Sequence, residues 1–361
     1  MEFALSEDQR LLQDSLAGTL ASLCPLDEVR KVADGDRQAR DAIARGLGEL
    51  GIHQVLVPET HGGLGLGLLE AALVQEALGA AVSPAPCLGT AMAAAAIRAG
   101  ANDSQQADWL GRIAAGEARF AIAAAERTGA RAGAGITSGP GGLTGKSLFA
   151  IEADTATHIL AADGEGGLHI VEAGAPGLGV KAMRTIDRTR VFSEVSFDNT
   201  PHETLAGGNR PGRASAAMIA VGRVLVAADT LGAAQAMLDK AVTYAGERKQ
   251  FNRVIASFQA VKHMCAEMAG EIEPARGLVW LAAHAGDEGQ DDSELLACLA
   301  KSHLAEIGTF VARTATEVHG GMGFTDLMGL HYWFKRIGVN RQLLGGPERV
   351  REDAARLQGW A

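Results

Sequence analysis

Aromatic residues are scarce in this sequence: they make up 4% of its 361 residues, and only two are tyrosines. Cysteine is scarcer still, with four residues (Cys24, Cys87, Cys265 and Cys298). They lie far apart and form no CxxC pair. Such cysteines are typical of reduced core thiols and argue against a disulfide scaffold or a metal site. We therefore expect no bound metal. With 46 glycines and abundant alanine, the sequence predicts a closely packed core of small side chains.

Positive charge is also in short supply, since 33 Lys and Arg residues face 43 Asp and Glu residues and give a net charge of -10. Nucleic acid needs a basic face and is therefore excluded as the main partner, whereas a small anion held by a few local cations is not. We see no uncharged run with the length and hydrophobicity of a membrane span, and no signal peptide at the N-terminus. We therefore expect a cytoplasmic protein without membrane insertion.

The hydrophobic periodicity changes twice along the chain and divides it into three expected domains. Residues 1–117 predict an N-terminal helical domain, which contains the glycine-rich turn Pro58–Gly65. Residues 118–206 alternate short β-like runs with glycine turns and predict a small β barrel. Residues 207–361 return to the helical pattern and predict a four-helix bundle. One of its helices should end or kink at Pro274.

A charged turn between two long predicted helices is the first stretch that suggests chemistry. It reads Glu247-Arg248-Lys249-Gln250-Phe251-Asn252-Arg253 and continues to Phe258 and Gln259 at the next helix start. Guanidinium and amide donors beside a helix N-terminus suit a pyrophosphate. On composition alone, a solvated basic turn is the favoured interpretation of the stretch.

The second stretch is Glu317-Val318-His319-Gly320-Gly321-Met322-Gly323. Three glycines in four positions let the backbone approach a ligand closely. A helix C-cap followed by a loop is the alternative interpretation.

These stretches together resemble the acyl-CoA dehydrogenase family. ERKQFNRVIASFQ is similar to its RxxFG…FQ signature, EVHGGMGF to its second flavin motif, and Pro58–Gly65 to its PExxGGLG loop. The resemblance spans essentially the whole chain and implies the family fold, an α body interrupted by a β segment, with FAD lying across a dimer interface. It implies that the ADP half of FAD contacts Arg248, Gln250, Phe251, Phe258, Gln259, Glu317, Gly320 and Gly321. Asn252 stands where the family usually has glycine, which could crowd the turn.

The same resemblance implies a reaction for which this chain lacks the usual base. Family members dehydrogenate an acyl-CoA thioester, with a glutamate that removes the α-proton and a flavin that takes the β-hydride. Of the two places where the family carries that glutamate, one corresponds to Gly345 and the other to Gly222. Glu348 lies near the first, but a carboxylate just after Gly346 and Pro347 is ordinary helix-start chemistry.

The family's contacts to the flavin ring are also reduced. Its TEPxxGSD motif is matched only by residues 125–132, AERTGARA, and its Trp-Ile-Thr by Phe149-Ala150-Ile151. The threonine, serine and aspartate that the family uses are absent. The half that holds ADP for a neighbour is thus retained, while the half that holds the chain's own flavin ring is lost.

Some bacterial members of the family are α2β2 heterotetramers, often acting on acyl-CoAs with bulky steroid-derived groups, in which one subunit supplies the base and ring pocket and the other the ADP pocket. Our leading hypothesis is the non-catalytic partner subunit, with a homologous subunit, acyl-CoA and an electron acceptor such as electron-transfer flavoprotein as partners. The alternatives are a homo-oligomeric dehydrogenase with an unusual base, a flavin monooxygenase of the same fold, and a flavin-free acyl-CoA-binding scaffold protein.

Overall fold

The computed structural model describes residues 4–129, 133–206 and 212–360, and its first part is helical. Ser6 accepts a hydrogen bond from the backbone N–H of Gln9, whose side chain accepts one from the Ser6 N–H, so the predicted capping box starts the first helix. The helical elements are α1 (Glu7–Leu23), α2 (Leu26–Ala33), α3 (Arg37–Glu49), η1 (Ile52–Gln54), η2 (Glu59–His61), α4 (Leu68–Ala80), α5 (Leu88–Gly100) and α6 (Asp103–Ala114). We did not predict α2 and α6, which are short and strongly charged.

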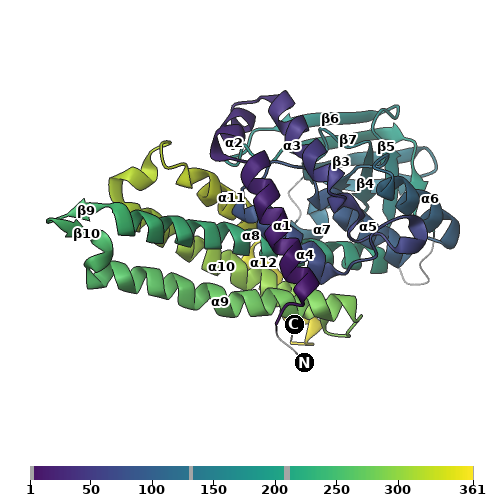
Figure 1. The fold of residues 1–361 in the computed structure, drawn as a ribbon. Coiled ribbons are helices and arrows are strands. Elements are labelled where there is room, and N and C mark those ends of the chain that lie inside the picture. The colour runs from purple at the N-terminus through teal and green to yellow at the C-terminus, as the bar shows by residue number, and fades with distance from the viewer. Residues whose placement is uncertain (1–3, 130–132, 207–211, 361) are drawn as a thin grey trace.

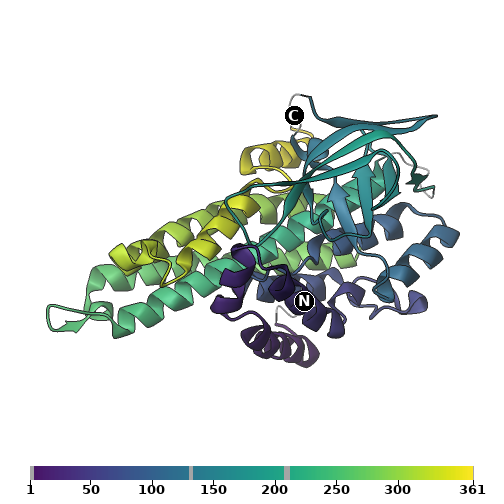
Figure 2. The same ribbon diagram turned by 90° about the horizontal axis from the view of Figure 1, so that it is seen from above.

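The middle part is one strongly twisted sheet with strand order β6-β7-β3-β1-β4-β5-β8, and β2 pairs with β3 (Figure 2). Its elements are β1 (Phe120–Ala123), α7 (Ala125–Gly129), β2 (Gly135–Gly139), β3 (Gly142–Ile151), β4 (His158–Ala162), β5 (Leu168–Glu172), β6 (Leu178–Met183), β7 (Phe192–Thr200) and β8 (Glu203–Thr204). Both faces are covered: Ala121 and Ala123 enter the core of the sheet, while Phe120 and Ile122 enter the core shared with the helices. The sheet is therefore bound to the helical body along one face.

The last part is a bundle of long helices that extends away from the sheet (Figure 1). Its elements are α8 (Arg213–Glu247), β9 (Lys249–Gln250), β10 (Arg253–Val254), η3 (Ile255–Ser257), α9 (Gln259–Asp287), α10 (Ser293–His319), η4 (Gly320–Phe324), α11 (Leu330–Gln342) and α12 (Pro347–Leu357). The observed order of helices, sheet and helix bundle is the predicted fold class.

Pro274 lies inside α9, so of the two outcomes that we expected there, an end or a kink of the helix, the end is wrong. Ile272, Ala275 and Val279 on either side of it are buried in the bundle. Burial of this face continues past the proline and outweighs the one backbone hydrogen bond that the proline removes.

A buried network of charged groups fixes the bundle to the sheet. Asp229 on α8 has no exposed surface and contacts Arg190 at 2.6 Å and Arg336 of α11 at 3.4 Å. Asn340 also donates to Asp229, at 2.6 Å. Burial alone would raise the pKa of Asp229, but the two guanidinium groups outweigh it and hold that pKa below its usual value. The network therefore stays charged and holds together α8, α11 and the segment just before β7.

Two helices reach the length and hydrophobicity of a membrane span, although charged residues such as Asp229 and Lys301 interrupt their apolar runs. They are α8 and the stretch Ser293–Phe324, and 72% and 61% of their most apolar windows are buried inside the protein. Both pack against each other in the bundle, so they are core helices.

Candidate functional site

The charged turn of the sequence forms a hairpin at the far tip of the bundle (Figure 1). β9 and β10 pair across the two residues Phe251 and Asn252, whose φ angles are 52° and 61°. Two successive positive φ angles are the geometry of a type I′ turn, and asparagine tolerates it better than most residues except glycine. Asn252 therefore does not crowd the turn, as we had expected it might; it takes the conformation for which the family uses glycine.

Donor groups surround this hairpin without partners of their own. The side chains of Arg248 and Gln250 are exposed and make no hydrogen bond or ion pair with other described residues. Phe251 is 87% exposed, its ring lies edge-on to that of Phe258, and no side chain caps the N-terminus of α9 at Gln259. A free helix N-terminus beside a guanidinium is a ready site for a phosphate.

The second glycine-rich stretch reaches the same tip. His319 at the end of α10 stacks on Tyr244 near the end of α8, with ring centroids 4.5 Å apart. Gly320 has a φ of 57°, and a Cβ placed on Gly320 or Gly321 would meet no atom within 4 Å. Glu317 is exposed beside them. Open backbone, a carboxylate and the nearby cations form a surface that fits the ADP half of FAD.

A large cavity lies at the other end of the molecule, between the sheet and the α11–α12 turn. This main cavity has a volume of about 980 Å³. Its walls come from the ends of β1, β3 and β7, from α7, and from the turn that includes Gly345. Its position is where the resemblance places the chain's own flavin ring.

The walls of the main cavity offer few groups to hold a flavin ring. Ala124, Ala125, Phe149 and Ile151 line it, and none of them carries a polar side-chain atom. Glu126 is used within the protein, because its carboxylate accepts hydrogen bonds from Ser147 Oγ at 2.6 Å and from the Leu148 N–H at 2.9 Å. Residues 130–132 of the TEPxxGSD counterpart lie outside the described residues. A flavin ring needs donors for its carbonyl oxygens and ring nitrogens, and Ala125, Phe149 and Ile151, at positions that match the family's ring-binding motifs, offer none from their side chains. The polar side chains of the cavity come from other positions, such as Thr185, Gln342 and Arg349.

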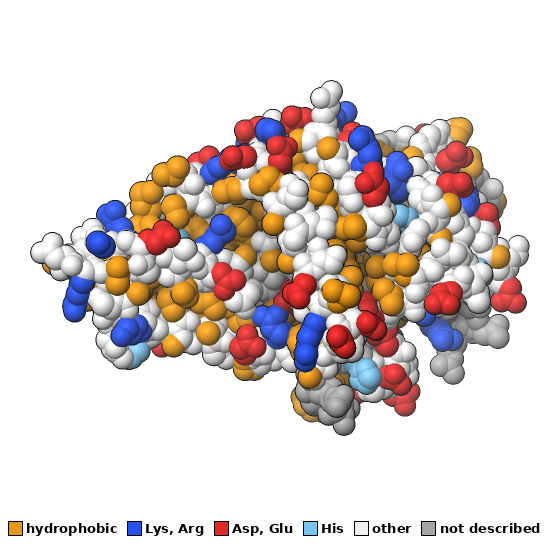
Figure 3. All heavy atoms as spheres, viewed as in Figure 1, with side chains coloured by type: hydrophobic (Ala, Val, Ile, Leu, Met, Phe, Trp, Pro, Cys, Tyr) orange, Lys and Arg blue, Asp and Glu red, His pale blue; other side chains and the backbone are white. Residues whose placement is uncertain are grey.

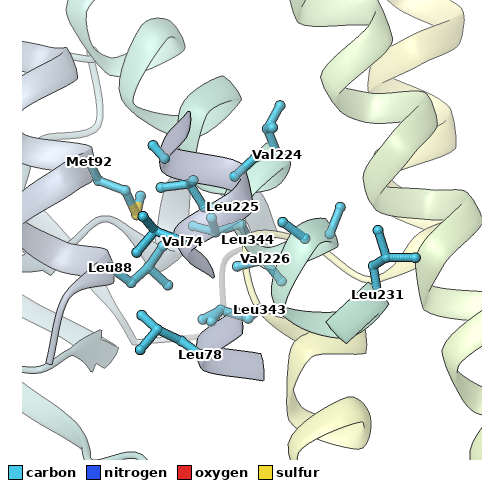
Figure 4. Close-up of a cluster of buried hydrophobic side chains, with 14 of the residues drawn as sticks. Val74, Leu78, Leu88, Met92, Val224, Leu225, Val226, Leu231, Leu343 and Leu344 are labelled. Atoms are coloured by element: carbon cyan, nitrogen blue, oxygen red, sulfur yellow. The ribbon is translucent and has the colours of Figure 1, made fainter. Parts of the chain in front are cut away.

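The two expected base positions are closed as well as empty of a carboxylate. A Cβ on Gly222 would lie 2.5 Å from Leu344 Cδ1 and 2.7 Å from Met92 Cε. Leu344 and Met92 belong to one buried apolar cluster with Leu343 and Leu225 (Figure 4). Gly345 has a φ of +104°, which side chains rarely adopt. A glutamate at either position would therefore require the surroundings to move.

Glu348 is the remaining carboxylate near these positions. It lies in the first turn of α12, its side chain is 77% exposed, and its Oε1 is 3.6 Å from Arg341 Nη2. It also reaches the edge of the main cavity. Its environment is that of a helix-start carboxylate with a surface ion pair.

Sequence reasoning missed two buried cations that hold the turn containing Gly345. Arg223 Nε donates to the Leu344 carbonyl at 3.1 Å, and Lys301 Nζ donates to the Gly345 carbonyl at 3.2 Å. Burial, together with the nearby Arg223 and Arg341, lowers the pKa of Lys301 to about 7. Both residues sit on faces of long helices, where a lone cation in an apolar stretch is the signal that could have identified them.

The hairpin lies at the tip of the bundle, whereas α7 and α12, next to the main cavity, lie where the bundle meets the sheet (Figure 1). The hairpin of the bundle tip cannot reach the chain's own main cavity, so one chain cannot surround a whole FAD with both. Exposed apolar side chains near the tip include Phe251, Phe324 and Leu327, and hydrophobic side chains gather over the bundle in Figure 3. Such a surface is typical of an interface with another subunit.

Comparisons with known proteins find one family in both helical parts of the chain. The acyl-CoA dehydrogenase N-terminal domain matches residues 6–117 and the acyl-CoA dehydrogenase C-terminal domain matches residues 212–357. The acyl-CoA dehydrogenase IpdE2 of Mycolicibacterium smegmatis is 30% identical over 355 residues, which cover 98% of this chain and 99% of that protein.

Two solved structures of paired proteins are also similar. A variant of the Tcur3481–Tcur3483 steroid ACAD has a TM-score of 0.88 and 29% identity, with 98% of each chain covered. The ChsE4–ChsE5 complex from Mycobacterium tuberculosis has a TM-score of 0.89 at 24% identity, with 100% of each chain covered, and shows the same fold.

Proposed function

The chain belongs to the acyl-CoA dehydrogenase family, whose members use FAD, and we propose that it is the non-catalytic partner subunit of a hetero-oligomeric enzyme. The carrying observation is the contrast between its two ends. The tip offers unpaired donors and open glycine backbone for the ADP half of FAD, while Ala125, Phe149 and Ile151 stand at the family's ring-binding positions without polar side chains and both base positions are glycines. A neighbour with an intact ring pocket would complete what this chain lacks.

In this assembly the chain's residues bind and orient a cofactor whose ring belongs to the partner. Arg248 and the N-terminus of α9 would receive the phosphates, and the backbone at Gly320 and Gly321 would lie along the adenosine side. FAD bound in this way would supply the hydride acceptor for the acyl-CoA, with an electron acceptor such as electron-transfer flavoprotein as the further partner. The α-proton must then be removed by a base of the partner subunit, because neither Gly222 nor Gly345 can take a proton.

The similar proteins suggest the substrate class and the type of assembly. One structural neighbour is described as a steroid ACAD and is named by two components, and another is a complex of two proteins. We extend this to the present chain as an α2β2 enzyme that acts on acyl-CoA thioesters with bulky, steroid-like groups.

Glu348 supports a second candidate, a homo-oligomeric dehydrogenase with a relocated base, because its carboxylate reaches the edge of the main cavity. That candidate requires the same chain to hold the flavin ring. It would have to do so without side-chain donors from Ala124, Ala125, Phe149 or Ile151.

The visible spectrum of the purified chain separates these candidates. We expect the chain expressed alone to carry little or no flavin and to have negligible acyl-CoA dehydrogenase activity. Coexpressed with a homologous subunit that has the glutamate and the ring motif, it should form a yellow, active complex. A yellow chain with stoichiometric flavin and turnover on its own would overturn the partner-subunit proposal. A colourless complex would point to the flavin-free scaffold protein.

A further inference from the structure

The main cavity opens beside a second cavity of different character. The second cavity, here called the cationic cavity, has a volume of about 510 Å³ and lies between α2, α11 and the β6–β7 loop. The two share Arg184, Thr185 and Ile186 as wall residues. One ligand could therefore occupy the main cavity and extend a short group past this shared wall.

The main cavity is suited to an apolar body. Besides the four apolar residues named above, Ile122, Phe192, Val339, Leu343 and Leu344 line it. Apolar walls with a few polar groups at one side are the usual composition of a small-molecule site, and the volume is within the range of about 300–1,000 Å³ for such sites. The apolar side chains of these walls can hold a bulky hydrocarbon body, and the walls also carry the polar side chains of Thr128, Gln342 and Arg349.

The cationic cavity has more positive charge than its own acids neutralise. Arg184, Arg188 and Lys335 line it, and none makes a hydrogen bond or ion pair with another residue in the described ranges. Arg30 and His331 are also there, but both lie beside Asp326.

The remaining acids on this wall offset only part of that charge. Asp187 is held by Arg336 in the buried network, which leaves Asp34 as the one acid of the wall without an ion pair among the described residues. A local positive excess in a chain with a net charge of -10 favours an anionic group at this wall.

We propose that this chain's main cavity binds a bulky apolar ligand with an anionic head, the body inside the main cavity and the head at Arg184. The proposal rests on the proposed function, because it requires that the cavity does not hold a flavin ring. The anionic head can belong to a free carboxylic acid or to a CoA ester, and both share the same apolar body. Such a site would give the non-catalytic subunit a binding role separate from its contribution to the partner's flavin.

Gly338 offers a way to fill the main cavity without disturbing the fold. It lies on α11 and lines the cavity, and a Cβ there would meet only Ile186 Cδ1, at 3.7 Å. Gly338→Phe should therefore place a ring in the cavity. Gly270→Phe is the matched control, because Gly270 is also helical, is exposed on α9, and has no atom within 4 Å of its added Cβ.

Calorimetric titration of the purified full chain with cholate and with choloyl-CoA tests the site. We expect saturable one-to-one binding of at least one probe, lost in Gly338→Phe and retained in Gly270→Phe, and the tighter probe tells whether the natural head is an acid or a CoA ester. Arg184→Gln should weaken binding about fivefold, as expected for an exposed charge contact. Methyl cholate, which has no anionic head, should bind equally to the wild type and to Arg184→Gln.

Two results would overturn the site. The first is that neither probe binds, and the second is that Gly338→Phe leaves the binding unchanged. Neither depends on the partner-subunit proposal, which fails separately if the untreated chain is purified with bound flavin.

Discussion

Gly345 shows how one backbone angle can exclude a catalytic group. Its φ of +104° belongs to glycine, and an added Cβ would lie 3.0 Å from Val350 Cγ2. We expect Gly345→Glu to lower the free energy of unfolding by about 1–3 kcal/mol, the usual cost of a side chain in such a conformation. It should not create dehydrogenase activity, because a base acts only when a hydride acceptor lies within reach of the adjacent carbon.

Urea unfolding and an acyl-CoA turnover assay on the same Gly345→Glu preparation check both parts. Turnover by that variant alone would mean that the main cavity holds a flavin ring after all. Gly18→Glu is a suitable control for stability, since an added Cβ at Gly18 meets no atom within 4 Å and its φ is not positive.

Lys301 makes stability depend on pH in a defined window. Burial, aided by Arg223 and Arg341, lowers its pKa to about 7, whereas an unfolded lysine titrates near ~10.4. Between these values the unfolded chain binds a proton that the folded chain does not, so this residue makes the free energy of unfolding rise with pH. Below about pH 7 both states are protonated, and its contribution no longer changes.

We therefore expect the difference in unfolding free energy between wild type and Lys301→Met to grow in favour of the wild type from pH 7 to pH 10. Urea titrations at several pH values measure it. The exposed Lys262→Met should show a difference that stays flat over the same range. A flat difference for Lys301→Met would mean that Lys301 remains charged when buried.

At the scale of elements, the hairpin β9–β10 is a small device for presenting donors. Its two central residues, Phe251 and Asn252, both have positive φ angles, which strain the backbone at Phe251. The ring of Phe251 is 87% exposed. Asn252→Gly should keep flavin bound in the assembled complex, because glycine adopts this turn without strain. Asn252→Val should release flavin, because β-branched residues resist positive φ. The flavin absorbance of the purified complexes compares them, and equal retention by both variants would show that the turn geometry does not matter for binding.

The elements also show what the sequence could and could not predict. The hydrophobic pattern predicts helices at 215–245 and 293–314 and strands at 168–171 and 191–197. These bounds are close to those observed for α8, α10, β5 and β7. At Pro274 the local sequence predicts that the helix ends or kinks, but α9 continues through it because tertiary packing buries its face on both sides. The closure of Gly222 by Leu344 and Met92 joins three distant segments and leaves no local pattern in the sequence.

At the scale of the whole molecule, function depends on which end of the chain a residue occupies. The tip carries Arg248, and Glu348 lies in the first turn of α12, which Figure 1 shows where the bundle meets the sheet. In a two-subunit enzyme the tip serves the partner's flavin, while the main cavity of this chain takes no part in the reaction. The assembled enzyme should therefore respond very differently to substitutions at the two ends.

We expect Arg248→Ala to release flavin from the assembled complex and Glu348→Gln to leave flavin and turnover nearly unchanged. The first change removes a charge-assisted phosphate contact of roughly 1.5–3 kcal/mol, which corresponds to about a 10- to 150-fold weaker flavin affinity. The second removes only a surface ion pair 3.6 Å from Arg341, for which about 0–1 kcal/mol is usual. Arg45→Ala, an exposed arginine on α3, controls for general loss of charge. Flavin content and steady-state turnover of the three complexes, each checked for intact assembly, give the comparison.

If Glu348→Gln abolished turnover while flavin and assembly stayed intact, Glu348 would be a relocated base and this chain a catalytic dehydrogenase in its own right. If Arg248→Ala kept its flavin, the charged turn would be a solvated cluster and the tip would have no part in cofactor binding.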